Sequence, residues 1–227
     1  MNNFLEVKNI TKNYFNQKKI NVLKNIKYKF KNGKIYSLVG PSGSGKSTLL
    51  NILSLIDRPT KGNLIINNEK INFNDVKIND KIRSSNIGII YQDKNLLNDF
   101  TALENISLAG LANGKSLNES LFGAEKIIKK LGLNNRSDHF PSELSGGETQ
   151  RIAIGRVLIN SPKIIIADEP SGNLDQKNAK EFFKILFNLK SKNRIIIYAT
   201  HNRYFANLAD CRLQLINGKL KSINGKK

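Results

Sequence analysis

The sequence predicts an α/β fold in which a mostly parallel sheet is covered by helices. Short apolar strand patterns at residues 163–167 and 194–199 are separated by an amphipathic helical pattern at residues 178–189. A glycine-rich loop at residues 40–47 lies between an apolar strand pattern and a run of helical length. Strands that are apolar throughout are typical of a parallel sheet buried on both faces.

The N-terminal part predicts antiparallel strands. Apolar and polar residues alternate in its first two strand patterns, as they do in half-buried strands, and Asn32-Gly33 then forms a turn. From about residue 96 to 159 the pattern becomes helical, with apolar residues at three- and four-residue spacing. The expected elements before residue 160 are strands at 4–10, 23–30 and 34–39, a helix at 47–56, a strand pair around 62–71, a strand at 87–91, and helices at 125–131 and 149–158.

We expect a single globular domain, since 227 residues with 39% hydrophobic side chains suffice for one core. No linker rich in Pro, Gly or Ser divides the chain. Within the domain, residues 1–92 and 160–227 are expected to form the catalytic core. Residues 93–159 are expected to form a helical subdomain that carries one of the motifs described below.

The net charge of +19 raises the question of a polyanionic partner, nucleic acid or anionic lipid. Of the 37 basic residues, 29 are lysines scattered along most of the chain. Arginine is better suited to bidentate phosphate and base contacts. We interpret the charge as solvated surface and expect no nucleic-acid partner.

Cellular location is predicted from what the sequence lacks. No apolar run of about 18 residues would span a membrane, and the first 15 residues have no apolar centre of a secretory signal. The single cysteine, Cys211, excludes an internal disulfide. We therefore expect the chain to stay on the cytoplasmic side.

The glycine-rich loop reads GPSGSGKS and matches the P-loop pattern. Its glycines let backbone N–H groups surround phosphate oxygens, and the helix that follows directs its positive end at the same anion. Lys46 would reach the β- and γ-phosphates, and the Ser47 hydroxyl would hold Mg²⁺. The residues expected to bind ATP here are Gly40, Pro41, Ser42, Gly43, Ser44, Gly45, Lys46, Ser47 and Thr48.

Two carboxylates follow the apolar strand at residues 164–167. The carboxyl end of a parallel strand is where α/β sheets bind ligands, so these side chains should lie beside the P-loop. Asp168 would contact Mg²⁺, and Glu169 would polarise the water that attacks the γ-phosphate. The two motifs together predict hydrolysis of a nucleoside triphosphate.

Residues 144–148 read LSGGE at the start of a predicted helix, where Ser145, Gly146 and Gly147 make a second anion site. With the P-loop and the IIIADEP strand, this motif resembles the ATP-binding cassette (ABC) family of transport ATPases. The resemblance implies that the signature, Ser145 to Glu148, covers the γ-phosphate held by a second ATP-binding subunit. It thus implies a head-to-tail dimer.

Other positions resemble the same family in order along the chain. Tyr14 resembles the aromatic residue that stacks on adenine, although the adjacent Phe15 is an alternative. Gln92 matches the glutamine that senses Mg²⁺ and the attacking water. Asp175, in SGNLD, lies in the loop that connects the two ATP sites, and His201 matches the histidine that contacts the γ-phosphate and orients Glu169.

Within the family, the segments DFTALEN, PSELSGGE and ADEPSGNLD are most similar to ATPase subunits of bacterial lipoprotein-releasing systems. That resemblance implies membrane permease partners, lipoprotein as an indirect cargo, and a peripheral location at the cytoplasmic face of the inner membrane. Macrolide exporters and cell-division complexes share the GE and GNLD features and remain alternatives. The apolar residues expected to contact the permease, or else to pack inside the helical part, are Leu96, Leu97, Phe100 and Leu103.

Two other function classes fit the sequence less well. Soluble cassette ATPases of DNA repair or translation need a long coiled-coil insertion or a second cassette, and a non-catalytic module would lose Glu169 or His201. Departures from the family pattern leave the phosphate and metal ligands in place. They are Ser171 for threonine, Asn202 for aspartate and Val157 for alanine.

Overall fold

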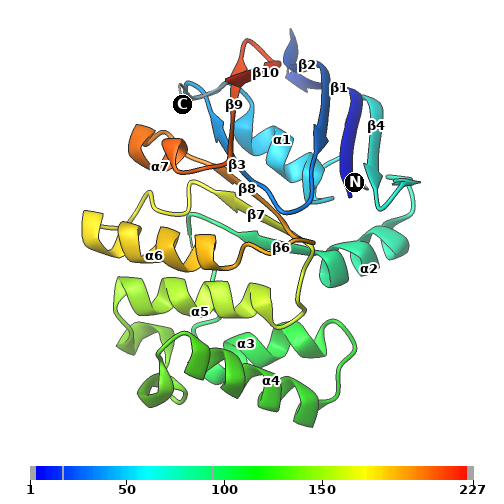
Figure 1. Cartoon of the computed structure of the whole chain (residues 1–227). Helices are drawn as coiled ribbons and strands as arrows, with labels where there is room; N and C mark the ends of the chain where they lie inside the picture. The colour runs from blue at the N-terminus through cyan, green and yellow to red at the C-terminus, as the bar shows by residue number, and fades with distance from the viewer. Residues whose placement is uncertain (1–3, 17, 94, 224–227) are drawn as a thin grey trace. The chain divides into compact units, whose positions relative to one another are not determined.

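The computed structural model describes residues 4–16, 18–93 and 95–223 (Figure 1). Its strands are β1 (Leu5–Asn16), β2 (Lys18–Phe30), β3 (Ile35–Val39), β4 (Lys61–Ile66), β5 (Glu69–Lys70), β6 (Ile87–Ile90), β7 (Ile164–Asp168), β8 (Ile195–Ala199), β9 (Cys211–Ile216) and β10 (Lys219–Ile223). The α-helices are α1 (Lys46–Leu53), α2 (Val76–Asn86), α3 (Ala102–Leu111), α4 (Leu117–Lys130), α5 (Gly146–Leu158), α6 (Gln176–Asn188) and α7 (Arg203–Asn207). Two short 3₁₀ turns, Asn134–Arg136 and Pro141–Glu143, precede α5.

The strands form two sheets. In the first, the order is β2-β1-β4-β5, and all its pairs are antiparallel. In the second, the order is β10-β9-β3-β8-β7-β6, and β3 runs parallel to both β8 and β9. The mixed, mostly parallel sheet and the antiparallel β part confirm the predicted fold class.

The chain divides into two compact units. The first comprises residues 1–80, 166–169 and 190–227, and the second comprises 81–165 and 170–189. The boundaries of these units differ from those of the expected catalytic core (1–92 and 160–227) and helical subdomain (93–159). The expected core and subdomain stay a prediction. The first unit holds the P-loop and the end of β7, whereas the second holds the signature.

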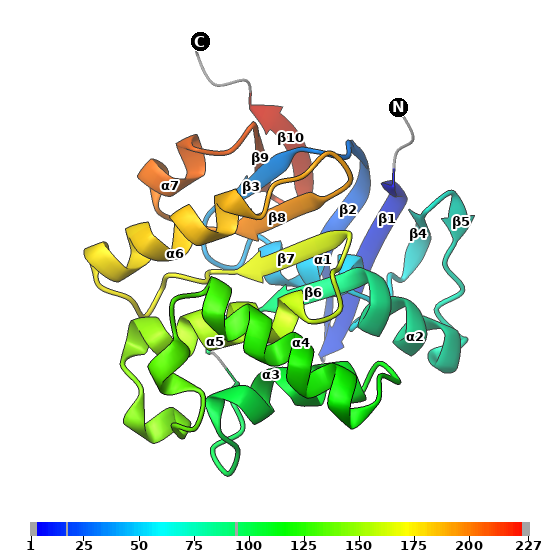
Figure 2. The same ribbon diagram turned by 60° about the horizontal axis from the view of Figure 1, so that its bottom comes forward.

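In the second unit, helices α3, α4 and α5 pack against one another (Figure 2). Each begins at a capping box, in which a Ser or Thr side chain and a Glu three residues later satisfy the first backbone N–H groups. The three pairs are Thr101 with Glu104, Ser116 with Glu119, and Ser145 with Glu148. The helix starts are therefore fixed by local sequence.

Three parts of the fold differ from the sequence expectations. Strand β1 continues well beyond residue 10, and strand β2 starts before residue 23. The two strands form one long hairpin. Helix α2 was not expected, because its residues show no apolar pattern of helical period. Its apolar residues Val76 and Ile78 are exposed. Strands β9 and β10 were also not expected, although alternating CRLQLI followed by Asn-Gly is a hairpin signal.

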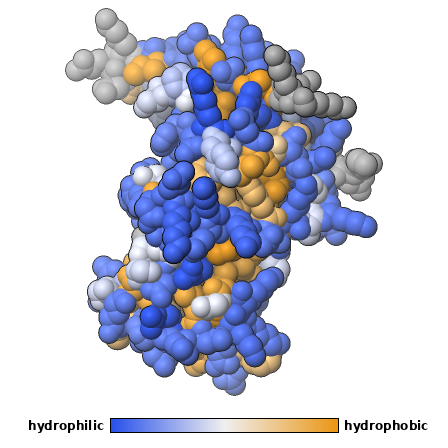
Figure 3. All heavy atoms as spheres, turned by 60° about the vertical axis from the view of Figure 1, so that its left-hand side comes forward, coloured by the Kyte–Doolittle hydropathy of each residue, from blue (hydrophilic) through white to orange (hydrophobic). Residues whose placement is uncertain are grey.

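The surface on one face of the molecule is largely polar, and the expectation of no nucleic-acid partner stays a prediction. Hydrophilic side chains cover most of the face in Figure 3, with smaller hydrophobic areas between them. Cys211 is a free, partly buried thiol at the start of β9. Among the described residues, no helix has the length and apolar character needed to cross a membrane.

Candidate functional site

The P-loop connects β3 to α1 in the first unit. Gly45 is the residue before the helix and has φ +99°, a conformation that glycine adopts without strain. A Cβ at Gly40 would lie 2.3 Å from the carbonyl oxygen of Leu215, so a side chain does not fit there. The Nζ of Lys46 donates to the carbonyl oxygens of Gly40 and Pro41 at 3.0 and 3.2 Å. The ammonium is thus held at the loop, where it can exchange these carbonyls for phosphate oxygens.

The hydroxyl groups of this loop differ in exposure. Ser42 and Ser47 are exposed, as is Gly43. The Oγ of Ser44 is buried and has no hydrogen-bond partner among the described residues. A buried hydroxyl without a partner is costly in a protein interior. The loop therefore offers hydrogen-bonding capacity that its own residues leave unused.

Strand β7 ends at the acidic pair. The Oδ1 of Asp168 is buried and lacks a hydrogen-bond partner in the described part of the chain. The next residue, Glu169, has φ +44°, a conformation that is uncommon for a residue with a side chain, and its N–H donates to the carbonyl oxygen of Ala199 on β8 at 3.2 Å. The neighbouring strand thereby holds Glu169 in a strained conformation of the kind common at functional sites.

His201 follows β8 and contacts Glu169. Its Nδ1 lies 3.0 Å from Oε2 of Glu169, and its backbone N–H donates to the same oxygen at 3.3 Å. The carboxylate is 20% exposed and the imidazole 76% exposed, so the histidine lies on the solvent side of the pair. The structure brings together the two residues that the sequence analysis assigned to catalysis.

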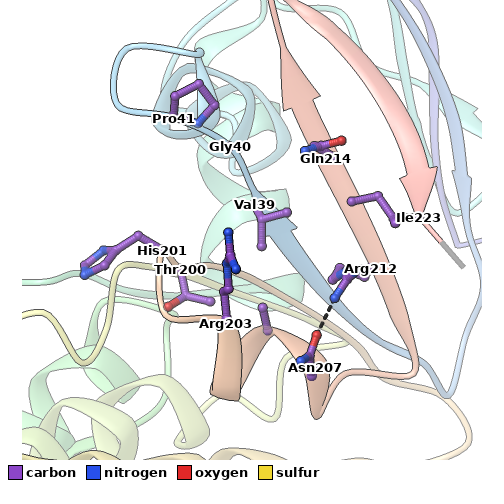
Figure 4. A pocket seen from close by; sticks show the side chains of 11 residues that line it. Val39, Gly40, Pro41, Thr200, His201, Arg203, Asn207, Arg212, Gln214 and Ile223 are labelled. Carbon is purple, nitrogen blue, oxygen red and sulfur yellow. Dashed lines mark hydrogen bonds between the residues drawn. The ribbon is translucent and has the colours of Figure 1, made fainter. Parts of the chain in front are cut away.

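A pocket of about 640 Å³ opens beside the start of the P-loop (Figure 4). Gly40 and His201 contribute to its lining, together with Arg203 and Arg212. Arg212 donates a hydrogen bond to Oδ1 of Asn207. None of the described residues that line the pocket is acidic. Arg203 and Arg212 therefore make this side of the pocket positively charged, which favours an anion near the loop, whereas the charged group nearest to the His201 ring is the Glu169 carboxylate.

Tyr14 is held in place by contacts close to α1. Its hydroxyl donates to Oδ2 of Asp57 at 2.8 Å, and burial together with this bond raises the pKa of Tyr14. The buried Lys12 lies with Nζ 4.8 Å from the centre of the tyrosine ring and 2.6 Å from Oδ1 of Asp57. The Thr48 side chain acts in the opposite direction and lowers the pKa of Tyr14. Phe15, by contrast, is 79% exposed.

Gln92 lies in the second unit and contacts the loop that precedes α6. Its Nε2 donates to Oδ1 of Asn173 at 3.3 Å. A Cβ at Gly172 would lie 2.8 Å from the same Nε2, so this glycine allows the glutamine to approach the loop backbone. The structure therefore joins Gln92 to the SGNLD loop that the sequence analysis associated with communication between ATP sites.

The signature forms the first turn of α5. Ser145 is the N-cap, and its Oγ accepts the N–H of Glu148. A Cβ at Gly147 would lie 2.6 Å from Oδ1 of Asn178 on α6, so the helix start packs closely on α6. Asp175 caps α6 by accepting the N–H groups of residues 177 and 178, and these bonds lower its pKa. The signature and Asp175 are thus neighbouring helix starts.

The segment after Gln92 is fixed by one buried amide. Asn105 is 1% exposed, and its Oδ1 accepts the N–H of Leu97 at 2.9 Å. Its Nδ2 donates to the carbonyl oxygens of Leu97, Phe100 and Thr101. Leu97 and Phe100 are 48% and 38% exposed, whereas Leu96 and Leu103 are half-buried. Two of the four expected contact residues therefore point to solvent from an ordered loop.

Several residues of these networks were not predicted from the sequence. The fold places hydrogen-bond partners beside three such residues, Arg136, Asn105 and Asp57. His139 lies between the two 3₁₀ turns.

A phosphate-binding loop, a strand that ends in Asp-Glu and a serine-capped signature helix define an ATP-binding cassette. The family model described as ABC transporter matches residues 23–172. The chain belongs to the ABC transporter ATPases and is an ABC-type, transport-coupled ATP hydrolase.

Similar proteins extend over nearly the whole chain. It is 43% identical to the lipoprotein-releasing system ATP-binding protein LolD of Rickettsia bellii, over 96% of this chain and 98% of the relative. It is 44% identical to the protein of the same name from Wigglesworthia glossinidia brevipalpis, over 99% of this chain and 100% of the relative. The dimeric ATP-binding cassette MJ0796 bound to ADP and Pi has a TM-score of 0.86 and 35% identity, over 98% of this chain and 100% of that one.

Proposed function

We propose that this chain is the ATP-hydrolysing subunit of a complex that releases lipoproteins from the bacterial inner membrane. The observation that carries the proposal is its identity of 43–44% to two lipoprotein-releasing relatives over 96–99% of its length. The chain would act as a peripheral subunit, held at the cytoplasmic face of the membrane by permease partners.

Hydrolysis would use the pair of Glu169 and His201. The Glu169 carboxylate accepts a proton from the water that attacks the γ-phosphate, and its strained backbone keeps it at the end of β7. His201 contacts the γ-phosphate and fixes Oε2 of Glu169 through its ring and backbone nitrogens. Lys46 exchanges its two carbonyl partners for the β- and γ-phosphates.

The residues near the P-loop fit a magnesium ion. Asp168 has a buried carboxylate oxygen with no partner among the described residues, and Ser47 is exposed at the start of α1. Hard oxygen ligands of this kind suit Mg²⁺. We assign the ion to Ser47 and Asp168, and to Gln92 on the family resemblance. When bound, Mg²⁺ neutralises charge on the phosphates.

Adenine would stack on Tyr14. The hydrogen bond to Asp57 and the cation of Lys12 on the ring hold this side chain, while the contact with Thr48 ties it to the helix that follows the P-loop. An aromatic ring that is fixed before the base arrives loses little conformational entropy on binding. Phe15 has no such support and is assigned no role in base binding.

Two chains would close head to tail on two ATP molecules. Ser145, Gly146 and Gly147 present backbone N–H groups and a positive helix end, which suits the γ-phosphate held by a partner subunit. Asp175 would connect the sites, because it caps the helix against which Gly147 packs. The dimeric state of MJ0796 supports this arrangement.

The permease would contact the surface formed by Leu97 and Phe100. Exposed large apolar side chains on an ordered loop suit a short amphipathic helix of a membrane partner. The test of the whole proposal is purification from detergent-solubilised membranes, followed by assay of the purified complex in vesicles that hold a lipoprotein. We expect a lipoprotein-releasing permease to copurify and ATP to drive lipoprotein into a soluble acceptor. Copurification of a macrolide-type or cell-division permease would contradict the assigned cargo while leaving the ATPase assignment intact.

A further inference from the structure

The signature of this chain carries an acidic residue at its fourth position after leucine. Glu148 is the third residue of α5, in the helix turn proposed to bind the γ-phosphate of a partner's ATP. A carboxylate at that place would repel the triphosphate if its charge were uncompensated. The sequence alone gives no sign of how this charge is balanced.

Arg136 balances it in the structure. Its Nε donates to Oε1 of Glu148 at 2.8 Å, while Oε2 of Glu148 accepts the N–H of Ser145 at 2.8 Å. The Glu148 side chain is 17% exposed, so the pair is partly shielded from water. These bonds, first that from Arg136, lower the pKa of Glu148 to about 2. The carboxylate is therefore ionised at neutral pH and is used on both oxygens.

This arrangement leaves the phosphate-binding groups available. Glu148 occupies the N–H of Ser145, and Ser145 Oγ occupies the N–H of Glu148. The N–H groups of Gly146 and Gly147 have no intrahelical partner, because they belong to the first turn. The Ser145 hydroxyl accepts through its oxygen and keeps its proton to donate. Two backbone donors and one hydroxyl thus stay available for an anion, while the Glu148 carboxylate is paired with Arg136.

Arg136 is itself held by the backbone. Its N–H donates to the carbonyl oxygen of Leu133 at 2.9 Å, and its carbonyl oxygen accepts the N–H of His139. One guanidinium nitrogen, Nη1, lies 3.4 Å from Nε2 of His139. The arginine is therefore part of an ordered turn before the signature.

We propose that Arg136 is a positioning residue of the signature, which pairs with Glu148 so that this acidic signature can close on the γ-phosphate of a second subunit's ATP. The proposal rests on the head-to-tail dimer described above. Without the arginine, Glu148 would add a net negative charge beside the triphosphate and weaken closure. Since the dimer holds two such sites, the effect counts twice in the dimer constant.

The experiment is a double-mutant cycle on ATP-dependent dimerisation. Each variant is made in the Glu169→Gln background, which should hold ATP, and the dimer dissociation constant is measured by analytical ultracentrifugation with ATP and Mg²⁺. Arg136→Gln should weaken the dimer about ten-fold per site and roughly a hundred-fold in total, a loss that shrinks in high salt. Glu148→Gln, which keeps an oxygen for the N–H of Ser145 and removes the negative charge, should weaken the dimer less than Arg136→Gln does. The double variant should recover to within about three-fold of the parent.

Controls separate charge from folding. Lys130→Gln removes an exposed charge from the same unit without touching Glu148 and should leave the dimer unchanged. Arg136→Lys keeps the charge and should retain most of the affinity, and thermal unfolding of each monomer reports stability. If the double variant is as weak as Arg136→Gln, or if Arg136→Gln pairs normally, the proposal is overturned. A parent that stays monomeric with ATP would overturn both the head-to-tail pairing and this role.

Discussion

Val157 occupies the space that a side chain at position 88 would fill. A Cβ at Gly88 would lie 2.2 Å from Cγ1 of Val157 and 3.0 Å from Cγ of Pro162. The larger residue on α5, where the family more often has alanine, is therefore matched by the absence of a side chain on β6. Val157, a departure from the family pattern, thus has a packing partner within the same unit.

The first prediction follows from this pair. Gly88→Ala should destabilise the fold by about 1–3 kcal/mol through overpacking. The double variant Gly88→Ala and Val157→Ala should regain most of the lost stability, because the new methyl group at position 88 fills the space that the valine side chain leaves. Urea unfolding of the single and double variants measures the coupling. Additive losses would show that the two side chains do not compete for space.

Lys46→Ala should abolish tight ATP binding. The ammonium compensates charge on the β- and γ-phosphates, and loss of such a charge-assisted contact costs roughly 2 kcal/mol or more. Titration calorimetry with ATP measures the effect, and Lys192→Gln, an exposed lysine in the same unit, serves as the control. ATP hydrolysis at the normal rate in Lys46→Ala would refute the P-loop assignment.

Glu169→Gln should stop hydrolysis and preserve ATP binding. The amide keeps the shape and the approach to His201 but does not accept a proton from water. The protein should accumulate as an ATP-bound dimer in size-exclusion chromatography with Mg²⁺. His201→Ala should also slow hydrolysis, because Glu169 loses the imidazole contact. Rapid turnover by Glu169→Gln would remove the carboxylate from the proposed role.

Tyr14 and Phe15 should differ in their effect on base binding. Tyr14→Ala should weaken ATP binding about three- to ten-fold, the worth of one aromatic stack at ~0.5–1.5 kcal/mol. Inorganic tripolyphosphate, which lacks the base, should bind the parent protein and Tyr14→Ala with equal affinity. Phe15→Ala should leave both affinities unchanged, because Phe15 is mostly exposed. The reverse pattern would assign adenine stacking to Phe15.

The contact surface should be separable from catalysis. Leu97→Gln or Phe100→Gln should leave ATP affinity and the Glu169→Gln dimer intact, since both side chains are exposed. Copurification with the permease and lipoprotein release should be lost. Leu117→Gln, which changes a 57% exposed leucine on α4, is the matched control. Normal release by the Leu97 and Phe100 variants would place the permease contact elsewhere.

The sequence predicted those features that depend on local pattern. The P-loop, the acidic strand end and the capped signature helix are contiguous motifs whose geometry follows from a few neighbouring residues. The pairing of Arg136 with Glu148 depends on how two turns pack, and the two residues lie 12 positions apart with no local pattern that predicts it. The hydrogen bond that holds Tyr14 likewise involves Asp57, which lies 43 positions away in the sequence.

The amide of Asn105 connects residues 97–101 rigidly to the start of α3. Its hydrogen bonds join the backbone of Leu97 and Phe100, the two exposed apolar residues of the loop, to the first turn of α3. Since α3 packs on α5, whose first turn is the signature, we expect a movement of this loop to be passed to the signature through packed helices. Asn105→Ala would remove these hydrogen bonds. We expect such a variant to keep its contact with a partner helix and to lose the coupling between that contact and the signature.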